Sequence, residues 1–300
     1  MREGKGRYHL GRVHKIGRLN DELIVAAIEH PATIQGARYA WTFTDAVVER
    51  EGNATRYAYA HLSKFLPEGT VTVVDEPHRA QDQRPEPNLL VATSPFVYIP
   101  EFSGIAFLHV WNQIETKAFI KRFCHIICST HDRFFVGCDI EPISDLRTFV
   151  ARLKAIDVFL EISAKVHPPN PLFGRAWRRL NEYIQKRNAG ELDIKEKSEE
   201  GSHLRTDVLE HVQGILAATA QHPYEPVAPI DITDAALLMA ADGYGKGKIV
   251  GTEGETRVVV RTSDTERGFI YHKVPDPEGL YQEARKNFTA VSVERKMSHE

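Results

Sequence analysis

Cysteine is scarce in this sequence: there are three among 300 residues, all between positions 124 and 138. An odd number of closely spaced cysteines does not form a disulfide framework, so we expect a reducing, cytoplasmic compartment. Long apolar runs are also missing, and no segment is expected to cross a membrane. The opening MREGKGRYHLGRVHKIGR lacks the apolar stretch of a secretory signal.

Several familiar active-site signatures are absent as well. The sequence has no Gly-x-x-x-x-Gly-Lys-Ser/Thr phosphate loop, no Gly-x-Ser-x-Gly elbow and no His-Glu-x-x-His motif. The formal net charge of −3 argues against a protein that is basic throughout. Residues 1–20 nevertheless contain six Lys or Arg against one acid, Glu3. This terminus is expected either to attract phosphate or to be a solubilising, partly frayed segment.

A dense group of potential metal ligands occurs in FCHIICSTHDRFF, residues 123–135. On a helix predicted over Glu115–Ser129, Cys124 falls on the apolar face and His125 on the other side, so they do not converge. A structural zinc site also needs a second ligand pair further along the chain, and none follows. We therefore predict structural cysteines, no bound metal and no cofactor.

The residue pattern predicts an α+β fold. Aromatic and β-branched residues indicate strands over most of the first ninety residues, while the three prolines of residues 76–88 indicate a loop or linker. Helical spacing predicts helices near residues 115–129, 144–153, 173–190 and 206–221. ALLMA, GKIVG, TRVVVRT and GFIYHKV are expected to be strands near the C-terminal end.

These elements predict a mixed, largely antiparallel sheet with three to four helices. Strands expected at residues 133–143 and 156–166 flank one of the helices and suggest a βαβ-like element. We divide the chain into a β-rich N-terminal subdomain (1–90), a central α+β segment (91–170) and C-terminal helices with β-hairpins (171–300).

Basic residues follow the polar sides of two predicted helices and flank the glycines of DGYGKGKIVG, residues 242–251. The second of these helices is expected to have Asn170 as its N-cap and an apolar stripe that includes Phe173 and Trp177. The glycine-rich stretch leads into a strand, which indicates either a twisted hairpin or contact with a nucleic-acid backbone. The predicted nucleic-acid-binding residues are Lys117, Lys121, Arg122, Arg175, Arg178, Arg179, Lys186, Lys246 and Lys248. Solvated helix faces are the alternative explanation.

An enzymatic alternative rests on YAYAHLSKF, residues 57–65. No catalytic centre is predicted, but a metal-independent ribonuclease-type toxin would use His61 as its acid–base group and Lys64 to bind phosphate. A third possibility is a protein-interaction module, such as an antitoxin or inhibitor, whose basic faces only keep it in solution.

Residues 90–170 resemble the RexA proteins, which act in abortive infection of phages. The similarity lies in a Ser94-Pro95-Phe96 strand, a Gly104-Ile105 strand and a strand end at Ile140-Glu141-Pro142. The resemblance implies a homodimer that binds DNA, rather than RNA, with little sequence preference, and that acts in phage defence together with a possible second defence protein.

Overall fold

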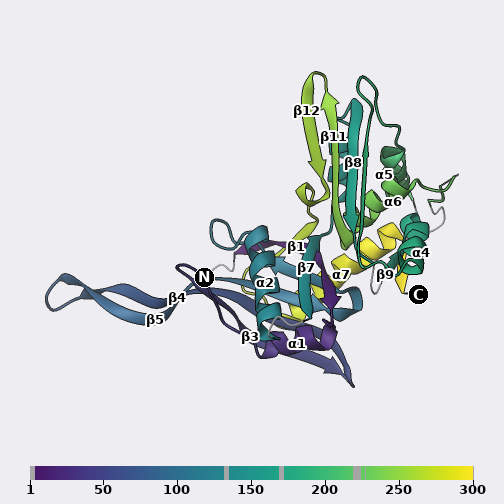
Figure 1. Cartoon of the computed structure of the whole chain (residues 1–300). Helices are drawn as coiled ribbons and strands as arrows, with labels where there is room; N and C mark the ends of the chain where they lie inside the picture. The colour runs from purple at the N-terminus through teal and green to yellow at the C-terminus, as the bar shows by residue number, and fades with distance from the viewer. Residues whose placement is uncertain (1–3, 132–134, 169–171, 219–223, 227, 300) are drawn as a thin grey trace.

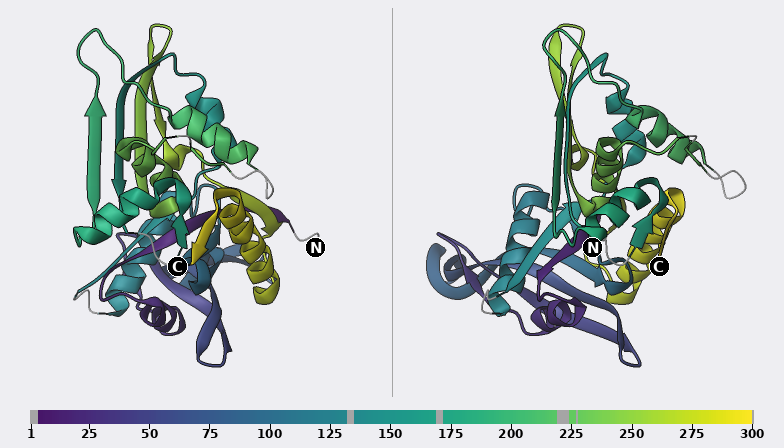
Figure 2. Two further views of the ribbon diagram at one scale, coloured as in Figure 1. Left: turned by 90° about the vertical axis from the view of Figure 1, so that its right-hand side faces the viewer. Right: turned by 45° about the vertical axis from the view of Figure 1, so that its right-hand side comes forward.

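A computed structural model of the chain describes residues 4–131, 135–168, 172–218, 224–226 and 228–299. Two β-sheets form two lobes, one above the other in Figures 1 and 2. Every strand pairing within them is antiparallel. The predicted α+β class is therefore confirmed.

The larger sheet has eight strands. Seven follow one another in the order β13 (Gly268–His272), β1 (Lys5–Gly17), β6 (Gly104–Leu108), β5 (Ala80–Ile99), β4 (Ala54–Asp75), β3 (Ala40–Glu51) and β2 (Ile34–Gln35). The eighth, β7 (Val136–Pro142), pairs with β1. Because β1 pairs with three strands and buries Leu10 and Val13, the alternative of a frayed N-terminal segment is wrong from Lys5 onward.

Helices cover both faces of this sheet. On one face, α1 (Asp21–Glu29) and α2 (Thr116–Thr130) pack over a core in which Phe107 and Phe119 stack with ring centroids 4.0 Å apart. On the other face lies α7 (Pro277–Arg295), whose Phe288 stacks on Phe102 (Figure 1). The apolar spacing that predicted α2 is confirmed, because Phe119, Phe123, Ile126 and Ile127 are buried and Ile120 is partly buried.

The smaller sheet has the order β10 (Leu192–Lys197), β8 (Val158–Val166), β11 (Gly245–Glu253) and β12 (Thr256–Arg261). On this sheet packs α6 (Ile232–Met239), with α5 (Val208–Ala217) beside it, as Figure 1 shows, and α3 (Leu146–Leu153) contacts α5. A short ladder of β9 (Leu172–Gly174) and β14 (Met297–His299) lies beside α4 (Arg178–Lys186).

Several expectations about the elements are wrong. The described residues contain seven α-helices, more than the three to four predicted, and α6 occupies ALLMA, which we expected to be a strand. The suggested βαβ-like element is not formed, because β7 and β8 belong to different sheets and α3 connects them. The predicted helix near Phe173 begins only at Arg178, since Leu172–Gly174 pairs with β14. Its expected N-cap, Asn170, lies outside the described residues.

The expected loop at residues 76–88 is largely a strand. Beyond the sheet, β4 and β5 continue as a two-stranded arm whose register runs from Leu66↔Leu89 to Asp75↔Ala80. Figure 1 shows this arm projecting away from both lobes. Pro85 and Pro87 are tolerated because a strand of an isolated ribbon has an unpaired edge toward which a missing N–H can point.

A buried polar cluster joins the lobes to α7. Asp242, in the π-helical turn η3 (Ala240–Tyr244), accepts hydrogen bonds from Arg295 Nη1 at 2.6 Å and Trp177 Nε1 at 2.7 Å. Arg12 of β1 donates to the backbone oxygens of Asp242 and Phe102 at 2.9 and 2.7 Å. All four side chains are at least nine-tenths buried, so these contacts are made away from water.

Candidate nucleic-acid interface

The nine cations predicted to bind nucleic acid do not lie on one surface. Those of α2 belong to the larger lobe, those of β11 lie where the lobes meet, and those around α4 lie beside the smaller lobe. Four of the nine have carboxylate partners: Arg175, Arg178, Lys246 and Lys248. Within the described part of the chain, the other five form no ion pair: Lys117, Lys121, Arg122, Arg179 and Lys186.

The two lysines of β11 form ion pairs with carboxylates on neighbouring strands. Lys246 Nζ lies 3.3 Å from Asp139 Oδ2 and 3.0 Å from Glu141 Oε1, both on β7. Lys248 Nζ lies 2.5 Å from Glu161 Oε1 on β8. Lys246 therefore lies between two carboxylates, whereas Lys248 shares Glu161 with Lys195 and Lys197, at 3.4 and 3.7 Å.

The glycines before them allow the lobes to approach closely. Gly243 has a φ of 86°, and a Cβ there would lie 3.2 Å from Arg12 Cγ. A Cβ on Gly245 would lie 2.1 Å from the backbone oxygen of Lys165, which no side chain allows. The close approach predicted for this glycine-rich stretch is thus made to the protein's own backbone.

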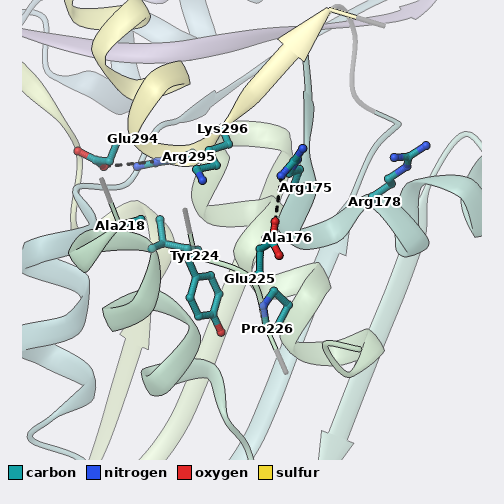
Figure 3. A pocket seen from close by; sticks show the side chains of 11 residues that line it. Arg175, Ala176, Arg178, Ala218, Tyr224, Glu225, Pro226, Glu294, Arg295 and Lys296 are labelled. Carbon is teal, nitrogen blue, oxygen red and sulfur yellow. Dashed lines mark ion pairs between the residues drawn. The ribbon is translucent and has the colours of Figure 1, made fainter. Parts of the chain in front are cut away.

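The arginines before and within α4 line a cavity of about 420 Å³ (Figure 3). Arg175 lies in a 3₁₀ turn before the helix, and its Nη1 is 3.6 Å from Glu225 Oε1. Arg178 Nε is 3.0 Å from Glu182 Oε1, one helical turn further on. Trp177 is buried as expected. The exposed pairs contribute little to stability, but they place an acid beside two of the predicted phosphate ligands.

Among the residues that the structure describes, no carboxylate pairs with the lysines and the arginine of α2. Lys117 and Lys121 are exposed, and Arg122 is half-buried with its guanidinium 5.2 Å from the centroid of the Trp41 ring. Trp41 belongs to β3, so the helix cation packs onto an aromatic ring of the sheet below it. A cation on a neutral aromatic ring leaves a net positive charge at that place, whereas a cation paired with a carboxylate leaves none.

Two further cations of this region are not among the nine predicted ones: Arg38, and Lys64, which was expected to bind phosphate only in the enzymatic alternative. Arg38 lies with its guanidinium 5.3 Å from the Tyr39 ring centroid. Lys64 is buried on β4; its Nζ is 4.1 Å from the same ring and donates to Gln113 Oε1 at 3.2 Å. No carboxylate pairs with Arg38 or Lys64 among the residues that the structure describes.

The α2–β3 surface is the name we give to these side chains. It comprises Arg38, Tyr39, Trp41, Lys64, Lys117, Lys121 and Arg122. Three of its five cations lie over the two aromatic rings, whereas Lys117 and Lys121 lie on the side of α2 that faces β7. The sequence signal was available in ARYAW, residues 37–41, which contains one basic and two aromatic side chains, but it is also typical of an ordinary strand.

Lys117 and Lys121 also border a cleft between the lobes, a cavity of about 450 Å³ between α2, β7 and β11. Its wall includes Glu141, whose side chain is only 4% exposed. Burial, and then the charge of Asp139, raise the pKa of Glu141 to about 7, although Lys246 opposes this shift. Acids and bases are mixed in this wall, so the cleft itself is not a simple phosphate site.

The two residues of the enzymatic alternative are kept apart. On β4, Tyr57 and Tyr59 face the α7 side while Ala60 and Leu62 face the α1–α2 side. By this alternation His61 lies on the α7 side and Lys64 on the opposite side. His61 instead contacts Tyr59 Oη at 3.0 Å and Asp45 Oδ2 at 3.2 Å, and burial lowers its pKa.

The cysteines lie within the larger lobe. Cys124 and Cys138 pack against the core beneath α1 and α2. A contact with Cys138, followed by burial, raises the pKa of Cys124 well above that of a free thiol. His131, at the C-terminal end of α2, has its Nε2 2.8 Å from the backbone oxygen of Leu23. Within the described residues, no three His, Cys, Asp or Glu side chains gather in a way that could hold a metal ion.

Comparison with known proteins gave one family. A family model described as Domain of unknown function (DUF4747) matches residues 29–223. The match spans every residue of the α2–β3 surface. A comparison with curated proteins gave no match. Among the described residues, no helix has both the length and the apolar character needed to cross a membrane.

Proposed function

We propose that this chain, which belongs to the DUF4747 family, binds nucleic acid through backbone phosphates at the α2–β3 surface. The observation that supports this proposal is a set of five cations with no carboxylate partner among the described residues: three lie around the rings of Tyr39 and Trp41, and Lys117 and Lys121 lie on the side of α2 toward β7. Such a surface attracts polyanions, because its positive potential is not cancelled locally.

The five cations would contribute in two ways. Arg38, Lys117 and Lys121 are exposed and can reach phosphate oxygens directly, and Arg122 lies at the edge of the Trp41 ring. Lys64 is buried under Tyr39 and contributes its charge to the field at the surface rather than a direct contact. Phosphate contacts carry no sequence information, so binding should show little sequence preference.

The proposal also includes the ligand type, the oligomeric state and the biological role that the sequence suggested. The resemblance to RexA proteins suggests DNA as the ligand, a homodimer and a role in phage defence. The cations around α4 belong to the same hypothesis as an alternative interface, since Arg179 and Lys186 have no ion-pair partner among the described residues.

Two triple variants separate the interfaces. In Lys117→Ala/Lys121→Ala/Arg122→Ala, three cations of the α2–β3 surface are removed. If all three contact phosphate, the salt slope of log K should fall by roughly 2.7 for duplex DNA and by about 2 for a single strand. The matched variant Arg178→Ala/Arg179→Ala/Lys186→Ala removes the same amount of charge from α4 and should leave the slope nearly unchanged.

Fluorescence anisotropy with labelled 20-mer oligonucleotides, titrated over a series of KCl concentrations, measures these slopes. Circular dichroism melting shows whether each variant is folded. Loss of binding in the α4 variant alone would place the interface at α4 and refute our assignment. Absence of binding by the parent protein at low salt would refute the proposed function itself.

A further inference from the structure

We infer that the preferred ligand is a single strand and that one of its unpaired bases stacks on Trp111; this inference rests on the proposed function. Trp111 is 78% exposed, more than any other large hydrophobic side chain among the described residues. The other two tryptophans, Trp41 and Trp177, are 5% and 1% exposed. An indole left in water is unusual in a folded chain and indicates a contact surface.

The loop that carries Trp111 is closed by its own backbone hydrogen bonds. Val110 and Ile114 exchange backbone hydrogen bonds of 3.0 and 2.8 Å, and Gln113 N donates to the oxygen of Val110 at 3.1 Å. Asn112 takes the left-handed conformation, with a φ of 58°, that closes so short a loop. A ring presented on a fixed loop loses little conformational entropy when a partner stacks on it.

The orientation of the indole is set by one neighbour. The ring of His109 meets it edge-to-face, with centroids 4.5 Å apart and an interplanar angle of 71°. His109 Nδ1 in turn lies 3.5 Å from the hydroxyl of Thr116, the first residue of α2. The greater part of the indole therefore stays open while one contact fixes it relative to α2.

Trp111 lies at the end of the α2–β3 surface. Gln113, two residues further along the same loop, accepts the hydrogen bond from Lys64. Lys117 follows Thr116 on the exposed side of α2. Sites for nonspecific single-strand binding combine a cationic track for the backbone with an aromatic ring for the bases, and both parts are present here.

The same geometry disfavours a duplex. In double-stranded DNA or RNA each base face is covered by its neighbours, so an indole can stack only after a base pair has been opened. In a single strand the faces are free, and every base offers one, so this contact adds affinity without adding sequence preference. A protein partner that buries Trp111 is the competing explanation, because tryptophan is also frequent at the centre of protein interfaces.

Trp111→Ala, with Trp111→Phe as its matched control, tests the inference. The probes are a 20-mer single strand of DNA, its RNA equivalent, the DNA duplex, and an abasic 20-mer that keeps the phosphates but lacks the bases. Trp111→Ala should weaken single-strand binding by about 5- to 150-fold. It should change binding of the duplex and the abasic strand little, and Trp111→Phe should restore part of the loss.

Tryptophan fluorescence gives a second readout. Because Trp111 is the exposed tryptophan, a stacked base should quench the emission of the parent protein, and this quenching should disappear in Trp111→Ala. Equal binding of single strand and abasic strand by the parent, with no effect of Trp111→Ala, would overturn the inference while leaving phosphate binding intact. Loss of self-association in Trp111→Ala, without loss of single-strand binding, would assign the ring to a protein contact. No binding to any of the four probes would instead refute the proposed function.

Discussion

Replacing Glu141 by glutamine should make the protein more stable at and above neutral pH. The side chain is 4% exposed, and its pKa is raised to about 7, first by burial and then by the neighbouring charge of Asp139. In the unfolded chain its pKa returns to 4.5. Between these values the folded state holds a proton that the unfolded state has lost. Stability contributed by this group therefore falls as pH rises through this window.

The size of the effect follows from the pKa difference. The pKa of Glu141 is higher by about 2.5 in the folded than in the unfolded state. Once Glu141 is ionised in both states, this difference lowers the free energy of unfolding by about 3 kcal/mol. Glutamine cannot ionise, so the variant lacks this unfavourable free energy. It also ends the ion pair with Lys246, but that lysine is 64% exposed and keeps Asp139 as a partner, so the loss should be small.

Urea unfolding of the parent and Glu141→Gln at pH 5, 6, 7 and 8 measures the difference. The advantage of the variant should grow by about 2.5 kcal/mol between pH 5 and pH 8. In Asp139→Asn the neighbouring charge is absent, so the pH dependence caused by Glu141 should shrink. A difference that stays constant across this range would show that Glu141 ionises alike in both states, and would refute the reasoning.

Two further predictions concern the core and the arm. Trp177→Ala should lower the free energy of unfolding by about 3 to 5 kcal/mol in urea titrations, because the ring is 1% exposed and its Nε1 donates to Asp242. Trp177→Phe, which keeps an aromatic ring but not the donor, should cost less. Replacing residues 68–87 by a two-residue turn should leave the melting temperature within a few degrees of the parent value, since neither core cluster contains a residue of this segment. A larger drop would show that the arm stabilises the lobe.

Elements with a strong apolar period could be predicted from the sequence, and those decided by distant partners could not. The stripe of α2 includes Phe119 and Phe123, both fully buried, and its expected bounds are close to Thr116–Thr130. The helix expected from Phe173 begins later because Leu172–Gly174 pairs with Met297–His299, at the far end of the chain. No local pattern reveals such a partner.

In two regions the sequence was ambiguous for different reasons. The prolines of residues 76–88 indicate a loop, but an isolated ribbon tolerates them along its free edge. The helix α7 was missed although its start was marked: Asp276 caps it, accepting from Gly279 N at 2.7 Å, and Pro277 occupies the first turn. The last element predicted from the sequence was the strand GFIYHKV, residues 268–274, and no helix was predicted after it.

The candidate site shows a more general limit. Helical period predicts that Arg178 and Lys117 point outward, and both do. It does not predict that Arg178 meets Glu182, whereas Lys117 meets no carboxylate among the described residues. Pairing depends on which strand or loop packs nearby, so the charge available to a ligand is a property of the fold.

The pattern of pairing is the strongest argument for the α2–β3 surface. The chain has 41 acids and 38 Lys and Arg residues, so carboxylates are plentiful enough to pair with every cation. At this surface aromatic rings, and not carboxylates, lie beside the cations. Arg38, Lys64 and Arg122 are 4.1 to 5.3 Å from the nearest ring centroids. Ring contacts offset only part of the repulsion between like charges. A bound polyanion would supply the missing countercharge without first displacing a carboxylate of the protein, and this is why we propose the surface as the binding site.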